Sequence, residues 1–194
     1  MDKLTREDLL TLEQYAATRQ AFRTEVMTHK QDRRVALGAH LTLYFEDRLT
    51  MRYQVQEMLR VERIFEPAEI EAELSTYNPL IPDGANFKAT LMIEYDDVTE
   101  RQTALQHLLG IEDRVWVRIA GHDRVYAIAD EDLERSTADK TSAVHFVRFE
   151  LSDEMLSALK GGASAAVGVD HRAYRHSLDP LPDNVRRSLM QDLR

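Results

Sequence analysis

A helix expected over residues 48–65 carries a polar face whose side chains could bind a ligand. Its polar residues are spaced three or four apart, so they share one side of the helix; they are Arg52, Tyr53, Gln56, Glu57 and Arg60. Two arginines can bind an anion through paired N–H donors, while the other three side chains would orient it or exchange a proton. The plain alternative is a solvated face braced by Glu57 and Arg60, a pair worth only about 0.2–0.5 kcal/mol. Both interpretations stay open at this point.

Histidines and carboxylates form a second set with possible chemistry, a hard-metal site. The chain has no HExxH motif, and His171 and His176 are five residues apart, which fits neither one helix face nor one strand face. His145 is expected in a strand, where a hydrogen-bonded packing role is the commoner one. Residues distant in sequence can still converge, and those with suitable ligand atoms are Glu46, Glu57, His122, His145 and His171.

Cysteine chemistry is excluded because the chain contains no cysteine. It therefore has no disulfide and cannot hold zinc or an iron–sulfur cluster through thiolates. No serine lies in a GxSxG elbow, and the abundant carboxylates do not single out an acid–base pair. These patterns require no cofactor and assign no catalytic residue, so an enzyme and a non-enzymatic protein are both compatible with the sequence.

Length and charge restrict the class of protein. The chain has 194 residues, 43% hydrophobic and 30% charged, which predicts one folded domain. A net charge of -9 argues against nucleic acid as the main partner, because a polyanion requires a basic surface. The first ten residues are too highly charged for a signal peptide, and no apolar run approaches the ~20 residues that span a bilayer. We expect a cytoplasmic protein, which the lack of cysteine also fits.

The sequence indicates an α+β fold, a mostly antiparallel sheet built from hairpins with helices covering one face. Helices are expected near Leu9–Ala16, at Arg19–Lys30 and from Pro67, and strands at Leu41–Asp47 and Phe87–Tyr95, among others. Residues 1–32 would be N-terminal helices, 33–174 the sheet-containing core and 175–194 a helical tail, all within one domain. Two prolines in the loop at 77–86 predict a rigid segment that could wall a site.

A small basic cluster stands out in this acidic chain. It consists of Lys30, Arg33 and Arg34, next to His29. Such a cluster is commonly a solvated edge and less often a docking point for an acidic partner.

Four long stretches resemble the DUF3501 family of bacterial proteins of unknown function. They are RRVALGAHLTLYFEDRLTMRYQVQEMLRVERIFE, YNPLIPDGANFKATLMIEY, GIEDRVWVRIAGHDRVYAIADEDLER and KTSAVHFVRFEL, and the resemblance extends from about Leu4 to Tyr174. Genes of this family often lie near those for rubrerythrin-like proteins and iron–sulfur oxidoreductases. The resemblance therefore implies a role beside an iron-dependent redox or peroxide-handling module, with any cluster held by the partner.

Three hypotheses follow. The first is an accessory protein of such a module, docking a rubrerythrin-like or iron–sulfur partner through the basic cluster. The second is an enzyme or ligand-binding protein whose anion or metal pocket is walled by helix 48–65 and the loop at 77–86. The third is a homodimer whose interface is the polar face of that helix.

Overall fold

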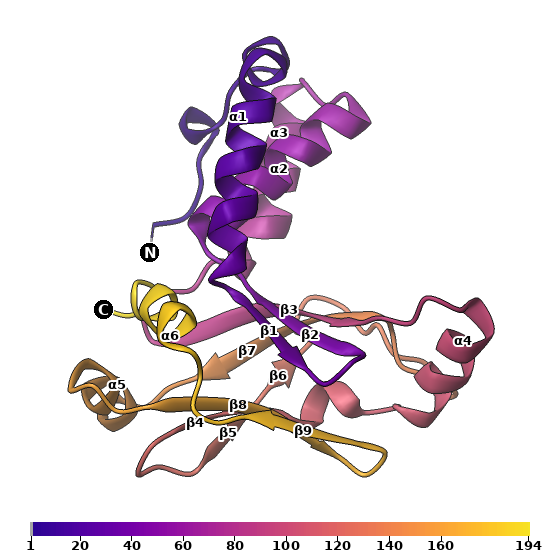
Figure 1. The fold of residues 1–194 in the computed structure, drawn as a ribbon. Helices are drawn as coiled ribbons and strands as arrows, with labels where there is room; N and C mark the ends of the chain where they lie inside the picture. Colours follow the sequence, from indigo (N-terminus) through magenta and orange to yellow (C-terminus); the bar gives the residue numbers. More distant parts are fainter. Residues whose placement is uncertain (1) are drawn as a thin grey trace.

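The computed structural model describes residues 2–194, which form two antiparallel sheets packed face to face beneath a layer of three helices (Figure 1). One sheet has the strand order β1-β2-β3-β7-β6 and the other β5-β4-β8-β9. The strands are β1 (Arg34–Leu37), β2 (Leu41–Phe45), β3 (Asn86–Ile93), β4 (Val115–Ile119), β5 (Arg124–Tyr126), β6 (Ile128–Ala129), β7 (Val144–Glu150), β8 (Ala165–His171) and β9 (Tyr174–Leu178). The predicted α+β class with antiparallel pairing is confirmed, although the strands divide between two sheets instead of forming one.

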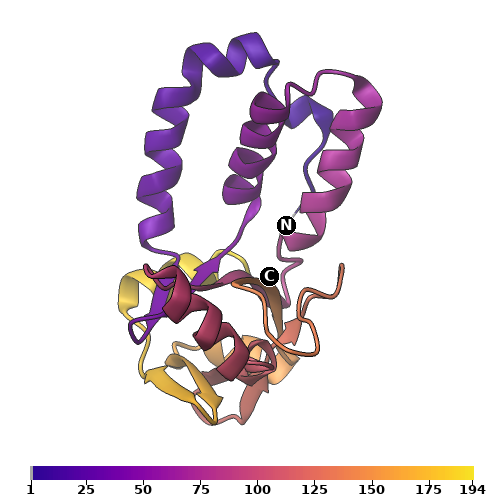
Figure 2. The same cartoon turned by 90° about the vertical axis from the view of Figure 1, so that its right-hand side faces the viewer.

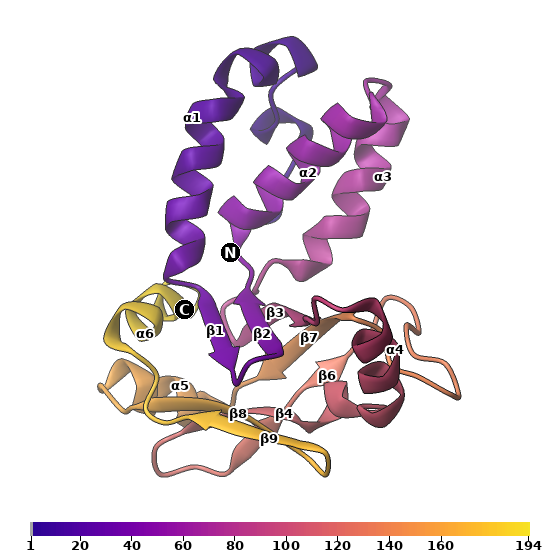
Figure 3. The same ribbon diagram turned by 45° about the vertical axis from the view of Figure 1, so that its right-hand side comes forward.

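Three helices, at residues 12–31, 48–62 and 67–77, lie side by side on the outer face of the five-stranded sheet, away from the other sheet (Figures 2 and 3). The helices are α1 (Leu12–Gln31), α2 (Arg48–Glu62), α3 (Pro67–Tyr77), α4 (Val98–His107), α5 (Asp153–Lys160) and α6 (Asp183–Met190), with short 3-10 turns η1 (Arg6–Asp8), η2 (Asn78–Leu80) and η3 (Ile111–Arg114). None of these helices in residues 2–194 is long and apolar enough to cross a bilayer.

Apolar side chains fill the space between the two sheets. Alternation along β2 and β3 turns Leu43, Phe45, Ala89 and Leu91 inward, because successive side chains of a strand point to opposite faces. This large core fixes the five-stranded sheet, whose outer face then becomes the floor for the three helices.

A second, smaller core lies among those three helices. It contains Leu4, Met51, Val55, Leu59, Leu74 and Ile81. The apolar stripe of α2 therefore packs toward α3 and the N-terminal segment. α2 begins at a capping box, in which Asp47 Oδ1 accepts from the backbone N–H of Thr50 at 2.9 Å.

The strands expected at Leu41–Asp47 and Phe87–Tyr95 are observed at Leu41–Phe45 and Asn86–Ile93, and three larger differences from the sequence-based boundaries occur elsewhere. The two expected N-terminal helices are one continuous helix, α1, because no residue between Ala16 and Arg19 breaks it. α2 ends at Glu62, where Arg63 adopts a left-handed conformation with φ 57°. The polar sequence from Tyr174 to Leu178 forms an edge strand, β9, which its poor alternation concealed.

The basic cluster is not a continuous exposed patch, which corrects the hypothesis that named it. The Arg33 side chain is 1% exposed, and its guanidinium donates to the carbonyls of Phe45 at 2.9 Å and Glu46 at 3.1 Å. It also forms an ion pair with the buried Asp192, just after α6. Of the three basic residues, only Lys30 and Arg34 reach solvent.

Candidate functional site

Glu46 lies where β2 ends and α2 begins. Its backbone is fixed, because its N–H donates to Lys88 O at 2.8 Å and its carbonyl accepts from Arg33. Alternation along β2 places the side chain on the same face as Tyr44, which is the outer face of the five-stranded sheet. Glu46 therefore points toward the helical layer and away from the core between the sheets.

The Glu46 carboxylate is buried and only half satisfied. The residue is 4% exposed, and its Oε1 accepts a hydrogen bond from Thr90 Oγ1 at 2.7 Å. Its Oε2 is buried and has no hydrogen-bond partner within residues 2–194. Buried polar atoms nearly always have a partner, so this oxygen requires a donor that residues 2–194 do not supply, either a ligand group or a water molecule.

A cavity of about 430 Å³ lies next to this carboxylate, between the sheet and the helices. We call it the interlayer cavity. Its walls combine flexible methionines and aromatic rings with a few polar groups; they are Met27, Lys30, Tyr44, Glu46, Met51, Gln54, Tyr77, Leu80, Thr90, Met92, Val144 and Phe146. A mostly apolar cavity of this size with few polar groups is typical of small-molecule sites, and methionine walls adapt to ligands of different shape.

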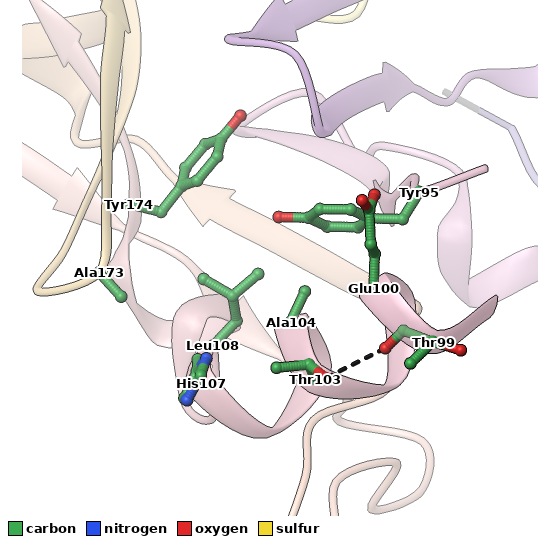
Figure 4. A pocket seen from close by; sticks show the side chains of 9 residues that line it. All are labelled: Tyr95, Thr99, Glu100, Thr103, Ala104, His107, Leu108, Ala173 and Tyr174. Carbon is green, nitrogen blue, oxygen red and sulfur yellow. Dashed lines mark hydrogen bonds between the residues drawn. The ribbon is translucent and has the colours of Figure 1, made fainter. Parts of the chain in front are cut away.

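Another hollow, of about 490 Å³, lies between α4 and the turn that joins β8 and β9 (Figure 4). Tyr95 and Tyr174 form its upper wall, and Ala104 and Leu108 lie below them. The Tyr174 hydroxyl is already satisfied, because it donates to Leu37 O at 2.7 Å and accepts from the backbone N–H of His40 at 3.0 Å. None of the buried polar atoms that lack a partner in the described chain belongs to this wall. The interlayer cavity is therefore the better candidate.

The polar face of α2 lies against α1 and the N-terminal segment. Gln56 is 1% exposed and bonds both backbone groups of Leu10, at 2.6 Å and 3.3 Å. Glu57 accepts from Tyr15 at 2.7 Å and from Arg19 at 2.7 Å and 2.8 Å. The side chains of Gln56 and Glu57 therefore already have hydrogen-bond partners within the chain.

The remaining members of that face are arranged around an aromatic ring. Arg52 and Tyr53 both pack on Phe22, the guanidinium carbon of Arg52 lying 5.3 Å from the ring centre. Arg60 is exposed and lies 3.4 Å from the Glu57 carboxylate. Ligand binding or homodimer formation through this face stays a prediction.

Glu57 is held in its ionised form by its partners. The hydrogen bonds from Arg19, with further ones from Tyr15 and Arg60, lower its pKa to about 2, although burial opposes this shift. A carboxylate with so low a pKa is a poor proton acceptor near neutral pH. This argues for a structural role of Glu57 in joining α1 to α2.

The five residues of the hypothetical metal set do not come together. Glu46 and His145 lie on opposite faces of the five-stranded sheet, because His145 pairs with the inward-facing Leu91. Glu57 is on α2, His122 in the turn between β4 and β5, and His171 at the end of β8. Across residues 2–194, no group of three or more histidine or acidic side chains is placed to hold a metal ion.

His145 belongs to a buried polar network instead. Its Nδ1 lies 2.6 Å from Asp130 Oδ2, and its Nε2 lies 2.8 Å from Thr141 Oγ1. Thr141 and Ser136 both donate to Glu112, at 2.9 Å and 2.6 Å. Burial opposes ionisation of Glu112, but these bonds, its own backbone N–H and His145 outweigh it and lower its pKa. The network pins the segment between β6 and β7 onto the core, which is the packing role expected for a lone strand histidine.

Sequence reasoning missed most of the interlayer cavity. It placed the walls at helix 48–65 and the loop at 77–86, and Met51, Gln54, Tyr77 and Leu80 do come from these elements. It selected the polar face of the helix, however, whereas the cavity uses the neighbouring face. One residue of the sequence could have indicated the cavity, namely Glu46, which is an acidic residue on the strand face that the helices cover.

The fold is that of an α+β protein with a cavity of about 430 Å³ between a helical layer and a two-sheet body. The chain belongs to the DUF3501 family, described as proteins of unknown function, whose model matches residues 3–193. It is similar to a crystal structure of a novel protein of unknown function from Burkholderia pseudomallei K96243, with 53% sequence identity, a TM-score of 0.95 and complete coverage of both chains. No curated protein matches the chain.

Proposed function

We propose that the chain binds a small organic ligand in the interlayer cavity and that Glu46 recognises a cationic or N–H-donating group on it. The unpartnered, buried Oε2 of Glu46 carries this proposal. An amine would supply the missing donor in a charge-assisted hydrogen bond, which is about twice as strong as a neutral one. The methionine and aromatic walls would bind an apolar body.

Lys30 is the one other charged residue on the cavity wall. It is partly exposed and forms no ion pair with another residue of the described chain. A lysine ammonium on a flexible stem can remain in water while the stem covers apolar surface. Lys30 therefore weakens binding of a positively charged ligand without occupying the buried Glu46 oxygen.

Calorimetric titration with matched pairs of compounds tests the proposal. The probes are phenethylamine with 2-phenylethanol, and hexylamine with hexanol, which differ in the amine but share the apolar body. We expect the amines to bind at least about tenfold more tightly than the alcohols, the effect of one hydrogen bond to a charged group. Glu46→Gln should abolish this preference, and Lys30→Met should increase amine affinity.

The control is Glu62→Gln, which removes an exposed carboxylate from α2 outside the cavity. It should leave all four affinities unchanged. Equal binding of amine and alcohol, or unchanged amine binding in Glu46→Gln, would contradict recognition by Glu46. Absence of binding by every probe, with an ordered water on Oε2 in a crystal structure, would show that water satisfies this oxygen.

The accessory role in an iron-dependent redox module stays a prediction that rests on the family resemblance. Burial of Arg33 reduces its docking patch to Lys30 and Arg34. Charge reversal at these two residues should abolish capture of a rubrerythrin-like or iron–sulfur partner. Unchanged capture would remove this patch from consideration.

A further inference from the structure

The outer face of the four-stranded sheet is uncovered and rich in arginine. Figure 1 shows no helix of the described chain beneath this sheet. Cross-strand pairs place Trp116 beside Tyr126 and Gly168, Arg118 beside Arg124, and Asp170 beside Arg175. The valines that alternate with these residues face the core. A sheet face with this composition is unexpected in a chain whose net charge is -9.

Trp116 is buried on this face by its neighbours. Its ring lies flat over Gly168, where an added Cβ would be 2.2 Å from Cζ2. The guanidinium of Arg124 covers the ring at 4.3 Å from its centre, and Trp116 is 3% exposed. The indole N–H is buried and has no acceptor within residues 2–194. A buried donor without an acceptor is costly to the stability of the fold. The same is true of the unpartnered Glu46 oxygen on the other side of the molecule.

Asp170 offsets part of the positive charge. It accepts from Tyr126 Oη at 2.6 Å and from Arg124 at 3.1 Å, and it pairs with Arg114 at 2.9 Å. Three arginines around one aspartate leave a local surplus of two positive charges. Arg175, the third arginine, is exposed and has no ion-pair partner in the part of the chain that the structure describes.

A hollow of about 410 Å³ lies among these groups. Trp116, Arg124, Asp170, Arg175 and Ser177 line it. It therefore presents two guanidinium groups, a hydroxyl and the His176 ring, and the buried indole N–H of Trp116 belongs to its wall. Guanidinium groups bind carboxylates and phosphates through two parallel hydrogen bonds, which an isolated ammonium cannot do. Asp170 repels an anion, but Arg124 and Tyr126 donate to its Oδ2, and Arg114 lies 2.9 Å from its Oδ1, which accepts no hydrogen bond within residues 2–194.

We propose that this hollow binds a small oxyanion, a phosphate or carboxylate group, between Arg124 and Arg175. The site is separate from the interlayer cavity, because it lies on the opposite side of the two-sheet body. Its volume also admits an organic group attached to the anion. Binding would provide the acceptor that Arg175 and the Trp116 N–H lack.

Tryptophan fluorescence tests the proposal directly, because Trp116 is the sole tryptophan of the chain. The probes are inorganic phosphate, phenyl phosphate and benzoate, with neutral benzyl alcohol, at constant ionic strength. We expect phenyl phosphate or benzoate to give a saturable change and benzyl alcohol none. Whichever of phenyl phosphate and benzoate binds more tightly identifies phosphate or carboxylate as the preferred group. A comparison of phenyl phosphate with inorganic phosphate shows whether the phenyl ring contributes to the affinity.

Arg175→Gln is the decisive variant, because Arg175 has no ion-pair partner within the described residues whose loss would disturb the fold. It should weaken anion binding at least about tenfold. Arg23→Gln, at an exposed position on α1, removes the same charge far from the sheet and should not change the affinity. Calorimetry serves as a second measurement of binding. No saturation by either method up to about 10 mM anion, or equal affinities in the two variants, would overturn the proposal.

Discussion

Glu57 illustrates how one residue can determine the response of the helical layer to acid. Its folded-state pKa of about 2 lies below the ordinary value of 4.5 for a glutamate, so the unfolded chain binds the proton more tightly. The stabilisation is therefore complete above pH 4.5 and is lost as the pH falls toward 2. We expect Glu57→Gln to lower the free energy of unfolding near neutral pH by about 1–2 kcal/mol, after discounting for the partly exposed Arg19.

Urea denaturation at several pH values measures this effect. The difference between wild type and Glu57→Gln should shrink as the pH falls, because both proteins then lack the charged carboxylate. Glu62→Gln is the matched control, since Glu62 is an exposed acid on the same helix. A constant difference between the proteins at every pH would show that Glu57 acts through packing and not through its charge.

At the scale of single residues, sequence predicts chemical type better than partner. Gln56 and Glu57 both lie on the polar face expected for α2, but spacing gives no indication of their partners, which are Leu10 from the segment before α1 and Tyr15 and Arg19 from α1 itself. Arg33 was expected in solvent because its neighbours are charged. Its burial depends on Asp192, which is 159 residues away. Local patterns contain no information about such pairs, so the candidate site could be only partly predicted.

The packing of β8 on β4 depends on one glycine. An alanine at position 168 would place its Cβ within 3 Å of three atoms of the Trp116 ring, which has little room to move. Overpacking of this kind costs about 1–3 kcal/mol. We expect Gly168→Ala to lower the unfolding free energy by this amount and to shift the Trp116 emission to longer wavelength as the ring becomes exposed, measured by denaturation and fluorescence.

A second substitution distinguishes a clash from a loss of strand flexibility. Trp116→Leu removes the ring and creates space above position 168. The double variant should then be more stable than the sum of the two single effects predicts, because the clash is absent. Additive losses would mean that Gly168 is required for the backbone and not for the ring.

Elements with strong periodicity were predictable, and those defined by tertiary pairing were not. Pro67 marks the start of α3 through local geometry, whereas Asp47, expected at the end of a strand, is the residue that caps α2. β9 has a polar outer side and becomes a strand only by pairing with β8. The division into two sheets also depends on which strands pair, and strand patterns alone do not specify this.

The whole molecule has two hydrophobic cores, one between the sheets and one among the helices. Arg33 connects them at the foot of α1, where α6 also lies (Figure 3). Its guanidinium bonds the β2–α2 connection and Asp192, and Asn184 of α6 donates to Asp32 at 2.8 Å. The C-terminal segment thus fixes the helical layer to the sheet, although it is remote from both in sequence. This connection favours unfolding of the whole chain in one cooperative step.

Asp192→Asn tests the connection. It leaves the buried Arg33 with Asp47, at 3.5 Å, as its remaining counter-charge. Removing one member of an isolated buried pair costs about 3 kcal/mol, so this change should cost between about 1 and 3 kcal/mol. We expect this loss in urea denaturation, with faster amide hydrogen exchange across α1, α2 and α3 than across β3 and β7. Asp179→Asn breaks the exposed pair with Arg118 and should cost less than about 1 kcal/mol. Uniform acceleration of exchange in both layers would instead show that the two cores unfold together even without this ion pair, because their shared sheet is sufficient to couple them.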